Sequence, residues 1–172
     1  MVGDEAGTPG HTEPPGVGEL LQALRDTPAR LRRVLEGFTA EALRRPPSVK
    51  PAGVEALSAL GHACHLRDIE IDGYHVRIRR LRNESHAPLE SLSGEQLALE
   101  RAYESDDPEV VLRTFEEARR LTLETLGVLR PEEWSRSGRF EGYGAVNLRS
   151  LVGILADHDQ GHLAALGEMP RE

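Results

Sequence analysis

Aromatic residues are scarce in this chain of 172 residues: they make up 4% of the composition, whereas hydrophobic residues as a whole make up 38%. A core that lacks aromatic side chains must be built from Leu, Val, Ile and Ala, which is typical of packed helices rather than of a β-sandwich. The length favours one domain with a sizeable core. The composition therefore favours an all-α fold.

Cysteine, excess positive charge and long apolar runs are also lacking. Cys64 is the only cysteine, so no internal disulfide forms and a reducing compartment is expected. No apolar run approaches the roughly 20 residues that span a bilayer, and residues 1–16 lack the basic and apolar regions of a signal peptide. The net charge of −8 argues against nucleic acid. We expect a cytoplasmic protein that binds neither nucleic acid nor a membrane.

One stretch of this acidic chain is rich in basic residues. Residues 75–82, HVRIRRLR, hold four arginines. On a helix they would spread over more than one face, with acidic residues nearby. Two interpretations stay open, a solvated face of ion pairs and a patch that binds anions.

Apolar residues recur at intervals of three and four along four segments, which predicts four helices. Asp107 followed by Pro108 is a strong helix start, and Asn147 can cap the last helix. Pro28 predicts a kink or a restart in the first helix, because proline removes an amide donor. The predicted helices cover residues 17–38, 54–81, 107–129 and 148–166.

The connections between these helices complete the predicted fold. Residues 87–109 form a crossover with a short helix near 94–104, long enough to return along the bundle. Residues 130–147 form a loop with a turn of helix near Pro131 and a small extended piece around 138–146. The prediction is an all-α four-helix bundle with a long crossover between helices two and three. It occupies residues 17–167 and follows a flexible tail over 1–16.

Two histidines interrupt the apolar stripe of the last predicted helix. His158 and His162 are four residues apart, so they share a face with Leu151 and Leu155. Buried imidazoles need polar partners, and a metal ion can satisfy both from one helix. Hydrogen-bonded or exposed histidines are the alternative. The pair also invites comparison with the zinc peptidase motif, but Asp159 stands where that motif has glutamate.

The second predicted helix carries two further histidines, in GHACHLRDIE at 61–70. His65 falls near the apolar stripe of this helix, and His62 lies about 60° around it. A buried third histidine that faces His158 and His162 would complete a three-histidine site with an open position for water or substrate. That arrangement is typical of catalytic rather than structural zinc.

Three motifs in this sequence resemble the DinB/YfiT-like superfamily. They are HLRDIEIDGYHVRIRRL at 65–81, FEEARRLTLETL at 115–126, and GAVNLRSLVGILADHDQGHLAAL at 144–166. The resemblance implies a four-helix bundle that is often dimeric and binds a divalent metal through His65, His158 and His162. The stretch SVKPAGVEA, at 48–56, departs from the family, which often has Lys-Trp-Ser there.

The resemblance also bears on function, because the superfamily includes metal-dependent transferases and isomerases that use a low-molecular-weight thiol. We therefore expect a thiol S-transferase or isomerase that acts on an electrophilic small molecule, with zinc as the default metal and nickel, iron or manganese as alternatives. A non-catalytic, stress-associated metal-binding module or dimeric scaffold is the competing hypothesis, and a fourth protein ligand such as His62 would favour it. Metal-assisted hydrolysis is the third, but the sequence does not single out a general base.

Several residues near the histidines have less specific interpretations. Cys64 is interpreted as a small buried hydrophobic residue rather than a nucleophile. Four acidic residues lie near the histidines in the sequence, and we interpret them as charges on outer faces rather than as partners of the imidazoles. They are Asp68, Glu70, Asp157 and Asp159.

Overall fold

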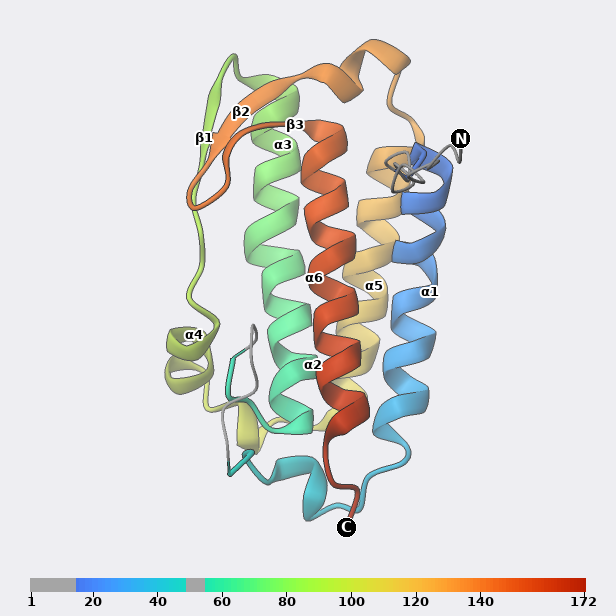
Figure 1. Cartoon of the computed structure of the whole chain (residues 1–172), viewed down its shortest axis with the longest axis vertical. Helices are drawn as coiled ribbons and strands as arrows, with labels where there is room; N and C mark the ends of the chain where they lie inside the picture. Colours follow the sequence, from blue (N-terminus) through green and yellow to red (C-terminus); the bar gives the residue numbers. More distant parts are fainter. Residues whose placement is uncertain (1–14, 49–54) are drawn as a thin grey trace, which may run out of the picture.

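The computed structural model describes residues 15–48 and 55–172, and its main body is an elongated bundle of four long helices (Figure 1). The first, α1, spans Val17–Leu35, and the second is built from α2 (Ala59–Asp68) and α3 (His75–Asn83). The third and fourth are α5 (Pro108–Gly127) and α6 (Leu148–Glu168). None of the described helices combines the length and low polarity needed to cross a bilayer.

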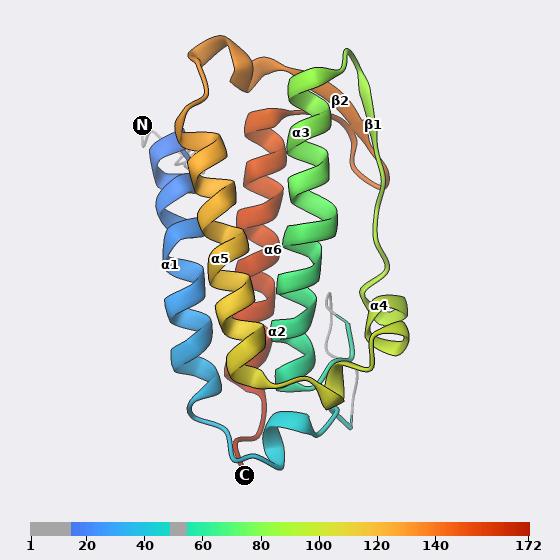
Figure 2. The same cartoon turned by 180° about the vertical axis from the view of Figure 1, so that it is seen from behind.

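The connection between α3 and α5 runs back along the whole bundle. It carries the strand β1 (Ala87–Leu89), the short helix α4 (Gly94–Glu100) and a 3₁₀ turn over Tyr103–Ser105. As a result α2–α3 and α5 point the same way, while α1 and α6 point the opposite way, as Figure 2 shows from behind. The crossover and its short helix confirm the connection predicted from the sequence.

Helix starts follow the expected capping chemistry. The Asp107 carboxylate accepts hydrogen bonds from the amides of Glu109 and Val110 at 2.9 and 3.2 Å, and Pro108 occupies the first turn. Asn147 accepts from the Ser150 amide at 2.8 Å and so starts α6. The second helix begins at Ala59, later than the predicted residue 54, because the Ser58 side chain caps it by accepting from the Gly61 amide at 3.0 Å.

Pro28 lies inside α1, yet the helix continues through it, so of the predicted kink or restart the restart does not occur. A proline in a helix leaves the carbonyl four residues earlier without its amide donor. That carbonyl belongs to Leu24, and it accepts a hydrogen bond from Arg119 Nη1 of α5 at 3.0 Å. A guanidinium from another helix therefore replaces the donor that proline removes.

A π-helical segment, Ile69–Tyr74, joins α2 to α3 and makes one continuous rod of the two. Its wider turn is closed by the His75 amide, which donates to the Glu70 carbonyl. Residues after Asp68 therefore lie on faces that a uniform α-helical period does not predict.

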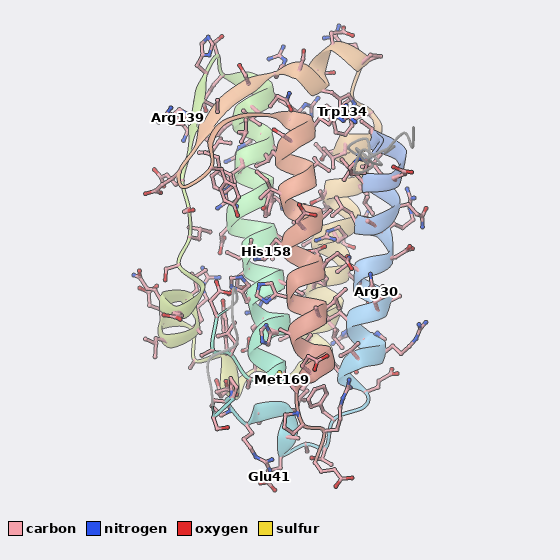
Figure 3. All side chains as sticks on the ribbon, viewed as in Figure 1. Arg30, Glu41, Trp134, Arg139, His158 and Met169 are labelled. Atoms are coloured by element: carbon pink, nitrogen blue, oxygen red, sulfur yellow. The ribbon has the colours of Figure 1, made fainter. Side chains whose placement is uncertain are left out.

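A small sheet covers one end of the bundle, so the all-α prediction is only approximate. Its strands are β1, β2 (Ser137–Phe140) and β3 (Gly144–Asn147), with β1 parallel to β2 and β2 antiparallel to β3. The hairpin between β2 and β3 agrees with the extended piece predicted around 138–146. It turns through Gly142 and Gly144, which have φ values of 82° and 84°. A 3₁₀ turn, Pro131–Ser135, precedes it and holds Trp134 at the same end of the molecule (Figure 3).

The core consists of two apolar clusters with a polar layer between them. One cluster contains Leu24, Leu126 and Leu155, and the other contains Leu31, Phe115, Leu163 and their neighbours. On α6, the residues between Leu155 and Leu163 include His158, Asp159 and His162. The polar layer is buried, and seven of its residues are at most 1% exposed. They are His62, His65, Glu70, Arg119, Thr122, Asp159 and His162.

Arg119 occupies the centre of this layer and uses every N–H of its guanidinium. It donates to both Glu70 oxygens at 2.9 Å and to the two Asp159 oxygens at 2.7 and 3.2 Å, besides the Leu24 carbonyl. Thr122 adds a hydrogen bond to Glu70. The α1, π, α5 and α6 segments thus all meet at one arginine.

We predict that Arg119→Met lowers the free energy of unfolding by about 3–5 kcal/mol, because it leaves two buried carboxylates without their cation. Urea unfolding followed by circular dichroism measures the loss. Arg120→Met is the matched control, since this neighbour pairs with Glu117 and Glu124 on the exposed side of the same helix and should change stability little. Equal effects of the two substitutions would contradict the assigned role of Arg119.

Candidate metal centre

Three imidazoles converge where α6 passes the second helix, and Figure 3 labels one of them, His158, at mid-height of the bundle. His65 Nε2 lies 3.0 Å from His158 Nε2, and His162 Nε2 lies 3.2 Å from the same atom. The ligand nitrogens of the three all lie within 4.8 Å of one another. The structure therefore brings together the three histidines that the sequence singled out.

The donor set suits a divalent metal ion. Zn–N bonds of about 2.0–2.1 Å at tetrahedral angles separate ligand nitrogens by roughly 3.4 Å, so small side-chain movements would admit an ion. The Nδ1 atoms of His65 and His158 are buried, and within the described residues they have no hydrogen-bond partner. The three convergent Nε2 atoms cannot all be satisfied by one another either, since neutral imidazole has one donor and one acceptor. An ion at the point of convergence would bind the lone pairs of the three Nε2 atoms and so satisfy them.

Burial keeps these imidazoles neutral, which is the form that binds metals. It lowers the pKa of His65 to about 4 and that of His158 to about 3, with the neighbouring histidines adding to the effect. The pKa of His162 is also lowered, first by burial and then by the other imidazoles. At neutral pH the cluster thus presents lone pairs rather than positive charge.

His62 stands behind the cluster rather than in it. Its Nδ1 lies 2.7 Å from Nδ1 of His162, on the side of that ring opposite the convergent Nε2. Burial lowers the pKa of His62 to about 4. The sequence left open whether His62 joins the site; the structure places it against a candidate ligand and away from the point of convergence.

Glu55 is a member of the site that the sequence did not indicate. Its two carboxylate oxygens lie 3.8 Å from His65 Nε2 and 3.7 Å from His162 Nε2. The side chain is 28% exposed, so it stands between the buried nitrogens and solvent. It comes from the irregular segment before α2, where no periodicity points to it. Its stretch, SVKPAGVEA, is the one that departs from the family pattern.

Gly94 closes the cluster from the side of the crossover. A Cβ at this position would lie 2.5 Å from His65 Nδ1 and Cε1 and 2.6 Å from Glu55 Oε1. No real side chain is accommodated at such distances without displacement of its neighbours. The start of α4 therefore fixes the positions of both His65 and Glu55.

The outer-face interpretation is wrong for three of the four acidic residues. Glu70 and Asp159 are buried against Arg119, and Asp68 is buried against Tyr103, whose hydroxyl donates to it at 2.8 Å, and beside Arg67. The structure links none of the three directly to a histidine ring by a hydrogen bond. Asp157 is exposed, as predicted.

Cys64 is fully buried and faces away from the histidines. Its Sγ lies 3.5 Å from Asp106 Oδ2 and 3.9 Å from the Tyr103 carbonyl oxygen. Burial raises the pKa of the thiol. The interpretation as a small buried residue is confirmed, because a protonated, enclosed thiol is a poor nucleophile.

A separate cavity of about 270 Å³ is lined by residues of α3 and α5. Its lining includes His75, Arg79 and Leu121 but none of the clustered histidines. The cavity therefore does not open onto the candidate metal centre.

Comparisons with known proteins agree with this fold. A sequence profile described as the DinB superfamily matches residues 23–166. The solved structure of YfiT from Bacillus subtilis, described as a probable metal-dependent hydrolase with an unusual four-helix bundle topology, superposes with a TM-score of 0.79 at 18% identity. The match covers 95% of this chain and 92% of that one.

A second solved structure is more distant. The colibactin self-resistance protein ClbS, in complex with double-stranded DNA, gives a TM-score of 0.61 at 16% identity, over 88% of this chain and 93% of that one. At these identities both structures establish the fold alone. None of the curated proteins matches this chain.

We predict that Gly94→Ala destabilises the protein by about 1–3 kcal/mol, because the added methyl group overpacks the His65 ring. The shift of the thermal unfolding midpoint measures it. Gly153→Ala on α6 is the control: nothing lies within 4 Å of a Cβ there, so the change should be neutral or slightly stabilising. A Gly94 variant as stable as this control would contradict the expected overpacking, because the segment before α4 would then move aside without loss of stability.

Proposed function

Because the chain belongs to the DinB superfamily, we propose that it binds a divalent metal ion through His65, His158 and His162 and uses it in an enzymatic reaction. The observation that carries the proposal is the convergence on one point of three neutral imidazole nitrogens, from the buried His65 and His162 and the partly buried His158. Zinc is the expected metal, and nickel, iron and manganese also suit three imidazoles.

A divalent ion held there would act as a Lewis acid and lower the pKa of a bound thiol or water. The side chains of this protein supply the rest. The three histidines come from two helices fixed by the Arg119 layer, and Glu55 stands at the solvent side of the cluster. A carboxylate at that position can accept the proton that the nucleophile loses.

The reaction that we favour is transfer or isomerisation with a low-molecular-weight thiol as co-substrate. In a transfer, the thiol gives its proton to Glu55 and its sulfur forms a bond to an electrophilic carbon, from which a leaving group departs. The absence of a nucleophile of the protein's own beside the cluster, among the described residues, supports a nucleophile from solution. Cys64, the only thiol, is enclosed on another face of α2.

Metal-assisted hydrolysis is the second candidate, and Glu55 is the observation that favours it. Hydrolysis needs a base near the nucleophilic water, and this carboxylate lies less than 4 Å from two candidate ligand nitrogens. The YfiT structure, of the same fold, is described as a probable metal-dependent hydrolase. Thiol transfer and hydrolysis thus share one site and differ in the nucleophile.

A non-catalytic, stress-associated metal-binding module, or a dimeric scaffold, is the remaining alternative. It requires a closed coordination sphere, and Glu55 is the residue that could close it as a fourth ligand. His62 is a weaker candidate, since its Nδ1 faces away from the point of convergence. The homodimer and the cytoplasmic location expected from the sequence stay predictions.

We continue to expect no nucleic-acid partner. Three of the four arginines in the stretch 75–82 are engaged within the protein: Arg77 donates to the Glu90 carbonyl, Arg80 pairs with Glu84 and Arg82 pairs with Glu133. The DNA named in the description of ClbS belongs to that protein.

Purified protein should contain stoichiometric metal, and His158→Ala should lose it, because one of three ligands is removed. Elemental analysis after dialysis measures the content. Chelation should lower the melting temperature of the wild type but not that of the variant. His86→Asn, a change at an exposed histidine, is the control and should keep its metal. Full metal in His158→Ala would refute the proposed ligand set.

Metal-loaded protein should consume a biological thiol in the presence of a model electrophile, and Glu55→Gln should slow this by about 10²-fold or more while the metal is retained. Free thiol is titrated over time, and an activated ester tests hydrolysis in parallel. If Glu55→Gln loses the metal instead, Glu55 is a ligand. If the loaded wild type turns over neither thiols nor esters, the non-catalytic module is favoured.

A further inference from the structure

His62 has a contact that the catalytic proposal does not use. Its ring and that of His162 are both buried, their Nδ1 atoms lie 2.7 Å apart, and the rings meet edge to face at 66°. Such a distance is that of a hydrogen bond, so one nitrogen carries the proton and the other accepts it. The question is which ring donates.

A metal ion bound by the cluster would determine which of the two rings donates the hydrogen bond. An imidazole that binds a metal through Nε2 carries its proton on Nδ1. His162 must then donate from Nδ1, and Nδ1 of His62 must accept. The proton of neutral His62 is therefore on Nε2, an atom that is buried and lacks a hydrogen-bond partner within the described residues.

We propose that His62 is a positioning residue for the metal centre: as a neutral acceptor it holds the His162 ring in the tautomer and orientation that direct Nε2 to the ion. This inference rests on the metal site proposed above. Metal-bound histidines usually donate their second N–H to a carboxylate, a backbone carbonyl or water. Here a second histidine takes that place.

Two features of the site make this contact specific. Among the three candidate ligands, only His162 has a partner on its Nδ1, because those of His65 and His158 have none within the described residues. A neutral partner also adds no negative charge to the site, whereas a carboxylate would. The negative charge that such an ion would meet at close range is then that of Glu55, on the solvent side of the cluster.

His62→Leu is the informative substitution, since it removes the acceptor and keeps an apolar side chain of similar size. We expect the affinity for Zn²⁺, measured by competition with a chromophoric chelator, to fall about 10–100-fold. His62→Asn offers a carbonyl oxygen to the same N–H and should recover part of the loss. Cys64→Ala is the matched control: it is equally buried on α2, contacts Asp106 and Tyr103 instead, and should bind Zn²⁺ as the wild type does.

A second measurement reads the proton directly and needs no variant. Long-range ¹H–¹⁵N spectra of the imidazoles in the Zn²⁺-loaded wild type should show His62 protonated on Nε2 and His162 on Nδ1. These spectra test the role of His62 even if His62→Leu fails to fold, which the circular dichroism spectrum of that variant without metal would reveal.

The outcomes separate the two proposals. A wild type that binds no Zn²⁺ overturns the metal site and, with it, the role of His62. A wild type that binds Zn²⁺ together with a folded His62→Leu of equal affinity overturns the positioning role alone. So does a His62 ring protonated on Nδ1 in the loaded protein. A loss in His62→Leu that is matched by Cys64→Ala would indicate a general packing effect and also overturns it.

Discussion

The buried guanidinium of Arg119 is the interaction on which the rest of this bundle depends. A cation removed from water is costly unless its hydrogen bonds and its charge are both satisfied. Here the carboxylates of Glu70 and Asp159 satisfy the charge, and five hydrogen bonds, one of them to the Leu24 carbonyl, use all the donors. Apolar side chains pack in many arrangements, whereas these contacts require Leu24, Glu70 and Asp159 to surround one guanidinium. The arginine therefore fixes how the four long helices stand relative to one another.

The contacts of Arg119 also position the helices that carry the histidine cluster. Asp159 follows His158 directly in α6, and Glu70 is five residues from His65, on the π-helical segment that succeeds α2. Both helices that carry candidate ligands are thus tied to α5 within about a turn of the cluster. Gly94 and Glu55 define the opposite side, from segments outside the bundle. The helices position the site where they meet, and two of the described residues around it, Glu55 and His158, are partly exposed.

The sequence could predict the features that depend on local patterns of residues. The helix starts at Asp107 and Asn147, the short crossover helix and the shared face of His158 and His162 follow from capping and from helical periodicity. Glu55 could not be found this way, because an irregular segment has no period. Helical periodicity does not single out Arg119 either, because other charged residues surround it in the sequence. The π turn shifts the phase after Asp68, which a uniform α-helical period does not predict. The restart considered at Pro28 does not occur in a helix where a distant residue supplies the missing donor.

The position of Cys64 indicates whether its thiol can serve as the nucleophile at the histidine cluster. It adjoins His65 in the sequence, but an α-helix turns successive residues by about 100°, and the thiol is enclosed by Tyr103 and Asp106 with its pKa raised by burial. A thiolate there would be formed next to a carboxylate and without a cation at hydrogen-bond distance from the sulfur. The described part of the chain therefore holds convergent ligands and a candidate proton acceptor, but no activated nucleophile. The proposed reaction accordingly takes its nucleophile from solution, and a thiol and water are the two that we propose for a metal ion beside Glu55.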